Sequence, residues 1–220
     1  MNFINYINES YERQFESDIK QYYEEVRSIL PTLPKNIDIY FKSNGIAHGM
    51  NTGGYAYSPE ITSIAISPKK TDINSVRKDL KATFFHEAYH LAHNYTGATG
   101  PFSLLECAIQ EGAATIFEQK YTDSKSKDLY GNFGQHSTSL LKEWLEQIKI
   151  IKNAKQMSTK DNNSITFYDE TDKIRWKLYK TGTWLVNQYI SNNNIDIKDF
   201  ANKDVQLLIK QITKSDTMNI

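Results

Sequence analysis

One stretch constrains this chain more than any other, the segment from Ala82 to His93, because it contains two histidines four residues apart. His86 and His90 are joined by Glu87 and two further residues, in the pattern H-E-x-x-H. On an α-helix, positions i and i+4 lie one above the other on one face, so both imidazoles can bind one metal ion. Glu87 lies about 100° around the helix from His86, which lets it reach a water at the metal without binding the metal.

The surrounding sequence predicts the helix that this pattern needs. Apolar residues recur every three or four positions between Asp72 and Asn94, which is the helical period. They are Ile73, Val76, Leu80, Phe84, Ala88 and Leu91. The alternative is that the two histidines and a solvated Glu87 share a helix surface without any metal.

A metal site also needs a third ligand, since zinc in hydrolases usually takes three protein ligands and keeps one position for water. A third histidine in the pattern H-E-x-x-H-x-x-G-x-x-H is excluded, because His93 stands where Gly belongs and Thr96 where His belongs. The remaining candidate is a glutamate from the next helix. We select Glu111, which a loop and half a helix separate from His90. His93 is too far along the helix to complete the site and is interpreted as a neighbouring or surface residue.

The next helix is predicted from Ser103 to about Lys120. Ser103 and Glu106 fit a capping box, in which the serine oxygen and the glutamate each accept a backbone N–H, so Glu106 has a structural role. Small residues beside Glu111 allow close approach of another helix. Glu118, on the same face as Glu111, either orients a ligand histidine or is solvated.

Other segments complete the predicted secondary structure. An amphipathic helix is expected from about Glu9 to Leu30, before Pro31. Strands are expected at Ile37–Phe41 and Ile61–Ile66, with a Gly-rich turn at 49–57 that is either a loop tip or a substrate contact. Loops are expected at 122–135 and 154–166, and further helices at about 136–151, 170–190 and 200–212. Gly182, inside the second of these, indicates a packing requirement, because Gly costs a helix about 1 kcal/mol relative to Ala.

Composition limits the functional classes. The 220 residues carry 26 basic and 26 acidic side chains, so the net charge is zero, and no basic face for nucleic acid or membrane lipid is apparent. Cys107 is the single cysteine, which excludes an intramolecular disulfide. No apolar run is long enough to span a bilayer. The start lacks the pattern of a secretion signal, which favours the cytoplasm. Export by a signal-less route, or a mature form cloned without its signal, is the alternative.

With these motifs, the chain resembles the gluzincins, zinc metallopeptidases with H-E-x-x-H on one helix and a glutamate on a following helix. More narrowly, it resembles bacterial predicted Zn-dependent proteases whose second helix carries E-G-x-A, here Glu111-Gly112-Ala113-Ala114. The resemblance covers about residues 37–190. It implies that His86, His90 and Glu111 bind zinc and that Glu87 activates water. It also implies that the strand Ile61–Ile66 is an edge to which an extended peptide adds.

The same family has Tyr-x-x-Gly on a later helix, and Tyr179-Lys180-Thr181-Gly182 matches it. Tyr179 is therefore the candidate donor to the oxyanion of the tetrahedral intermediate. The alternative for Tyr179 is a core aromatic with its hydroxyl at the surface. His136 is the alternative donor, although a single histidine in a loop is also simply exposed.

These observations predict one α+β domain, mostly helical and zincin-like, with a small N-terminal β-sheet whose edge strand lies by the active-site helix. Its parts are a helix and sheet over 1–70, zinc-binding helices over 71–121 and a helical part over 136–213. The predicted function is zinc-dependent hydrolysis of peptide bonds in a peptide or protein substrate, with Glu87 as general base. The competing hypothesis is a non-catalytic zincin-like binding protein with a structural metal or none.

Overall fold

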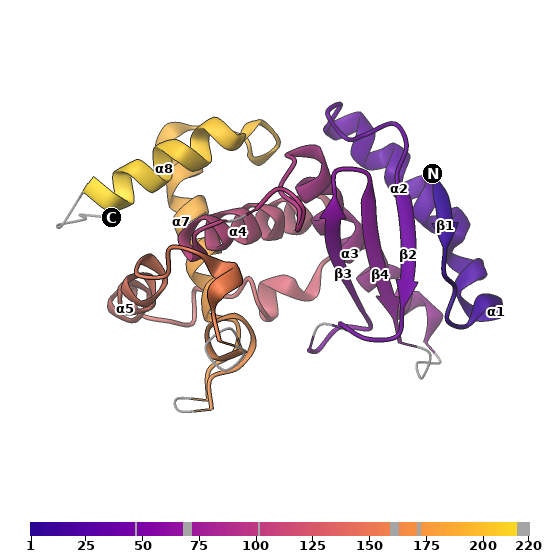
Figure 1. Cartoon of the computed structure of the whole chain (residues 1–220), viewed down its shortest axis with the longest axis horizontal. Helices are drawn as coiled ribbons and strands as arrows, with labels where there is room; N and C mark the ends of the chain where they lie inside the picture. Colours follow the sequence, from indigo (N-terminus) through magenta and orange to yellow (C-terminus); the bar gives the residue numbers. More distant parts are fainter. Residues whose placement is uncertain (47, 68–71, 101, 159–162, 171–172, 215–220) are drawn as a thin grey trace. The chain divides into compact units, whose positions relative to one another are not determined.

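The structure, a computed structural model, describes residues 1–46, 48–67, 72–100, 102–158, 163–170 and 173–214 (Figure 1). Contacts divide the chain into two units. The first consists of Met1–Gly100 with Phe117–Lys125, and the second of Pro101–Ile116 with Ser126–Ile220. Helix α4 (Leu104–Tyr121) is uninterrupted and contributes residues to both. The expectation of a single domain stays a prediction, whereas the α+β class is confirmed.

The first unit is built on a sheet whose order is β1-β2-β4-β3, as Figure 1 shows. The strands are β1 (Asn2–Ile4), β2 (Asp38–Lys42), β3 (Thr52–Ser58) and β4 (Ile61–Ile66). β2 is parallel to β1 and to β4, whereas β3 is antiparallel to β4. The register places Ile39 opposite Thr62 and Gly54 opposite Ile64. The two predicted strands are thus confirmed, within one residue, and β1 was not predicted.

The predicted turn at 49–57 is wrong over most of its length, because Thr52–Ser58 forms strand β3. Thr52 and Ala56 are buried, while Tyr55 and Tyr57 are exposed on the opposite face. This alternation is typical of a strand, but the two glycines at 53 and 54 interrupt the pattern of side chains that would have revealed it.

The prediction that Ile61–Ile66 is an edge strand is also wrong, since β4 lies between β2 and β3. Only Pro59 and Glu60 separate β3 from β4, and so short a connection makes the two strands an antiparallel hairpin. β3 therefore takes the edge, and β3 contacts helix α3 (Ile73–Ala92). An edge strand does lie by the histidine helix, but it is β3.

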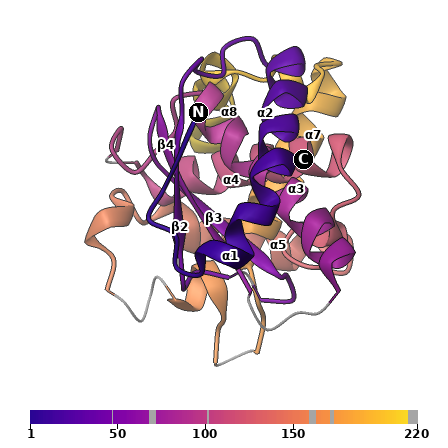
Figure 2. The same ribbon diagram turned by 90° about the vertical axis from the view of Figure 1, so that its right-hand side faces the viewer.

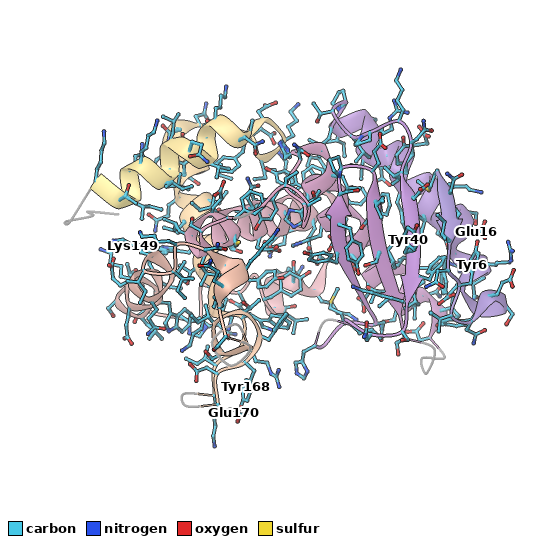
Figure 3. All side chains as sticks on the ribbon, viewed as in Figure 1. Tyr6, Glu16, Tyr40, Lys149, Tyr168 and Glu170 are labelled. Atoms are coloured by element: carbon cyan, nitrogen blue, oxygen red, sulfur yellow. The ribbon has the colours of Figure 1, made fainter. Side chains whose placement is uncertain are left out.

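Helices cover the sheet of the first unit. α1 (Glu9–Glu12), a 3-10 turn (Arg13–Phe15) and α2 (Glu16–Ile29) follow one another and confirm the predicted N-terminal helix. α3 contacts β3 and β4, and α2 packs against α3 (Figure 2). The Tyr6 hydroxyl donates a hydrogen bond to Glu16, so the chain after β1 is attached to α2 (Figure 3).

Helix α3 begins where the sequence predicts. The Asp72 side chain accepts hydrogen bonds from the backbone N–H groups of Asn74 and Ser75, which is the N-cap arrangement. The apolar stripe is buried, including Val76, Leu80, Phe84, Ala88 and Leu91. Among the helices of the described residues, none is long and apolar enough to cross a membrane.

The second unit contains the first part of α4 together with α5 (Thr138–Lys149), α7 (Lys177–Asn193) and α8 (Asn202–Lys214). Ser137 caps α5 by accepting from the N–H of Leu140, which confirms the start of the helix predicted at about 136–151. The regions expected to be loops contain short turns: 3-10 turns at Lys125–Asp128 and Ala154–Gln156 and a π-turn at Asn163–Phe167. Residues 159–162 of the predicted loop at 154–166 lie outside the described residues.

The predicted start of the helix at about Glu170 is wrong, because α7 begins at Lys177. Trp176 has φ of 67° and Lys173 has φ of 59°, and these left-handed conformations cannot continue a right-handed helix toward the N-terminus. Tyr168, labelled in Figure 3, instead pairs with Arg175 in an isolated antiparallel bridge. Residues 171–172 of the predicted helix lie outside the described part of the chain.

Helices α4 and α7 cross where both have glycine. A Cβ at Gly182 would lie 1.7 Å from the carbonyl oxygen of Ala108, and a Cβ at Gly112 would lie 2.1 Å from the carbonyl carbon of Gly182. Real Cβ atoms essentially never approach other heavy atoms closer than 3.0 Å. The packing requirement predicted for Gly182 is therefore confirmed, and this crossing holds the part of α4 that carries Glu111.

Candidate metal centre

The two histidines of the motif lie on adjacent turns of α3. His86 and His90 are buried, with 7% and 4% of their surfaces exposed, and their ring centroids are 4.9 Å apart. The rings meet edge to face, at 78°. The helical spacing thus does place both imidazoles on one face, as predicted.

Glu111 joins this pair. One ligand atom from each of His86, His90 and Glu111 lies within 4.8 Å of the other two. Ligands about 2.1 Å from one zinc ion in a tetrahedral site are roughly 3.4 Å apart, a spacing comparable with that of these three atoms. Among the described residues, this is the group of histidine, cysteine and acidic side chains that can hold a metal ion.

Glu118 contacts the His86 ring at Nδ1. The Nδ1 of His86 donates to Oε2 of Glu118 at 2.8 Å, and the Ser124 hydroxyl donates to the other carboxylate oxygen. Glu118 is fully buried, so water does not weaken this contact. Because Nδ1 is engaged, His86 offers Nε2 to a metal, which is the orientation that a carboxylate fixes in many zinc sites. Of the two interpretations of Glu118, the one in which it orients a histidine is therefore correct.

The donor set fits zinc. Two imidazole nitrogens and one carboxylate are ligands that catalytic zinc sites use, with a fourth position left for water or substrate. The histidines are buried and one already has its ring orientation fixed, which reduces the cost of ordering them around an ion. The residues present are thus suited to this metal.

Glu87 lies outside the ligand group and faces strand β3. It is 7% exposed, and its side chain lies directly over the backbone of Gly54. Glu87 directly follows His86 on α3, and its side chain faces β3 and is not among the three residues of the metal group. The assignment of Glu87 as the general base stays a prediction.

His93 is not among the three residues of the metal group. Its ring packs against Tyr89 with centroids 4.3 Å apart, at the C-terminal end of α3. The pKa of His93 is lowered to about 4, mainly by burial and to a smaller extent by the charge of the nearby His90. His93 is therefore a neutral residue beside the motif, as the sequence interpretation allowed.

The two candidate oxyanion donors lie in the second unit. Tyr179, on α7, is partly buried and meets the rings of Trp176 and Tyr130 edge to face, at 5.7 and 5.5 Å. His136 accepts a hydrogen bond from Nζ of Lys180 at 3.1 Å, and burial and then the charge of Lys180 lower its pKa. The assignment of either residue to an oxyanion stays a prediction.

Sequence reasoning missed two residues of this region. Ser124 follows α4 in a polar segment that gives no sign of its contact with Glu118. Gly54 belongs to a segment interpreted as a turn, although a glycine within a strand does indicate close approach of another group.

One comparison with known proteins identifies a family. A protein family described as "Predicted Zn-dependent protease (DUF2268)" matches residues 15–210. Neither the curated proteins nor the solved structures provide a match. Because the family match spans most of the sequence and includes both helices of the candidate metal centre, this chain belongs to that family of predicted Zn-dependent proteases.

Proposed function

We propose that this protein is a zinc-dependent peptidase of the gluzincin type. The observation that carries the proposal is the grouping of His86, His90 and Glu111, whose ligand atoms lie within 4.8 Å of one another. Glu87 follows His86 in the sequence and is not part of this group. The family to which the chain belongs is described as one of predicted Zn-dependent proteases. In this proposal the three grouped residues hold the zinc.

Each residue has one task in the proposed reaction. When bound, zinc supplies Lewis-acid chemistry, in which the pKa of a coordinated water falls to about 7 and the scissile carbonyl is polarised. Glu87 accepts a proton from the attacking water and returns it to the nitrogen of the leaving amine. Glu118 keeps His86 in one tautomer and orientation. Tyr179, or alternatively His136, donates a hydrogen bond to the developing oxyanion.

The outer edge of β3 favours a polypeptide substrate. The N–H groups of Gly97 and Ala98 bond the carbonyls of Ala56 and Tyr57 at 2.9 and 2.8 Å, which closes one end of this edge. In an antiparallel strand alternate residues face the same side, so the backbone groups of Thr52 and Gly54 face outward like those of Ala56. Within the described residues, the backbone hydrogen bonds that other segments make to this edge all lie at its closed end. The open end lies beside Glu87 and can bind an extended peptide through main-chain hydrogen bonds.

The test compares the parent protein with Glu87→Gln, which keeps the size of the side chain but removes the base. The parent is expected to cleave unfolded polypeptide. Glu87→Gln is expected to bind zinc as tightly and to unfold at the same temperature, while its kcat falls by orders of magnitude. A parent that cleaves no member of a diverse peptide library, or a Glu87→Gln variant with parental activity, would refute the proposal. A partner bound equally by both proteins without turnover would favour a binding protein.

A further inference from the structure

Strand β3 has a glycine where the side chain of Glu87 meets it. A Cβ added at Gly54 would lie 2.4 Å from Cγ, 2.6 Å from Oε1 and 2.7 Å from Cδ of Glu87. These three atoms are its nearest neighbours, and all belong to this one side chain. No side chain larger than hydrogen fits at position 54 while Glu87 keeps its present conformation.

The backbone gives no other reason for a glycine. Gly54 does not have the positive φ that favours glycine, unlike Gly45 and Gly49 at φ of 84°. Its neighbours on the same face of β3 do have side chains. The Thr52 hydroxyl lies 2.8 Å from that of Thr83 on α3, and Ala56 is buried. Space for Glu87 is therefore what excludes a side chain at position 54.

The Glu87 atoms that a Cβ at position 54 would meet determine how far the Glu87 side chain must move. Cγ is the second carbon of the Glu87 side chain, so relieving a contact at Cγ and Cδ requires rotation near the backbone. Such a rotation moves the whole carboxylate, whereas a contact with the tip alone could be relieved by a small twist. A displacement of about 1 Å in a catalytic group can cost on the order of 10²-fold in rate.

We propose that Gly54 is a positioning residue for the general base: its bare backbone leaves the space that the Glu87 side chain occupies, and a larger residue would displace the Glu87 carboxylate. This role rests on the proposed peptidase function. The contact itself does not, because the structure gives it independently of any reaction.

The central experiment measures Gly54→Ala against Gly134→Ala, a matched control at which an added Cβ meets nothing within 4 Å. In Gly54→Ala, kcat on a peptide substrate is expected to fall by about 10-fold to 100-fold, with KM and zinc content unchanged. Gly134→Ala is expected to keep the parental kcat. If the parent is active and Gly54→Ala keeps its kcat, the positioning role is wrong and the peptidase function stands.

A double-mutant cycle separates this role from simple packing and needs no turnover. In the parent, Gly54→Ala is expected to lower the Tm by roughly 2–12 °C through overpacking. In Glu87→Ala, which lacks the conflicting atoms, the same substitution is expected to leave the Tm unchanged. If Gly54→Ala alone does not fold, folding should return in the double variant. A Tm loss of equal size in both backgrounds would overturn the proposal.

The two experiments also distinguish the possible failures. A parent without peptidase activity would refute the proposed function and the positioning role together, while a Tm loss that disappears in Glu87→Ala would still establish the contact. If the parent is active but Gly54→Ala lowers the Tm equally in the parent and in Glu87→Ala, only the positioning role is refuted.

Discussion

Glu118→Gln changes the group that holds His86 while nearly preserving its size. The contact is 2.8 Å long and the carboxylate is fully buried, so its charge acts on the imidazole without screening by water. The amide oxygen of glutamine can still accept from Nδ1, but it has no charge to make the ring a stronger ligand. Loss of such a partner typically weakens metal binding by about 10-fold to 100-fold, or about 1.4–2.7 kcal/mol. Since glutamine keeps one hydrogen bond, we expect a loss near 10-fold.

The assay is an equilibrium titration with zinc against a chromophoric chelator, which gives the Kd for zinc without any peptide substrate. Glu106→Gln is the matched control, because Glu106 lies on the same helix but interacts with Gln206 and with the Ser103 backbone. It is expected to keep the parental Kd. Equal zinc affinity in Glu118→Gln and the parent, or an equal loss in the control, would refute the proposed role of Glu118.

Four further substitutions test the ligand assignment, the oxyanion donor and the α4–α7 crossing. Glu111→Ala should weaken zinc binding strongly, whereas Glu106→Ala should keep zinc and lose about 1 kcal/mol of folding stability, because its cap is removed. Chelator titration measures the zinc affinity and urea unfolding measures the stability. The reverse pattern would contradict the ligand assignment. Tyr179→Phe should lower kcat by roughly 10²-fold with zinc affinity unchanged, and a parental kcat would move attention to His136. Gly182→Ala should lower the free energy of unfolding by about 1–3 kcal/mol or more, because the added Cβ overpacks the α4–α7 crossing, even though alanine has the better helix propensity. A neutral or stabilising effect in thermal unfolding would contradict this crossing.

Local signals predicted the metal-binding helices well. The apolar period of α3 depends on residues close in sequence. The same is true of the capping box of α4, in which the Glu106 N–H bonds the Ser103 hydroxyl at 3.1 Å and the Glu106 carboxyl accepts from the Ser103 backbone. The spacing of His86 and His90 then determines their geometry, because a helix leaves little freedom.

Features that depend on distant residues were not predictable in the same way. The edge position of β3 follows from parallel pairing of β4 with β2, which no local pattern encodes. The late start of α7 follows from a left-handed Trp176, a conformation that is uncommon for a non-glycine residue. The role of Glu118 required knowing that its carboxylate reaches back to α3, and the role of Gly54 required knowing which side chain lies above it.

Metal analysis of the purified protein tests the central claim, a zinc centre formed by His86, His90 and Glu111, most directly. Elemental analysis after gentle purification should find one zinc per chain in the parent. A preparation of His90→Ala that is as thermally stable as the parent should contain none. Adding zinc to metal-free protein should restore one zinc per chain in the parent but not in the variant. Absence of any transition metal from both the native and the reconstituted parent, or parental zinc content in His90→Ala, would contradict the account.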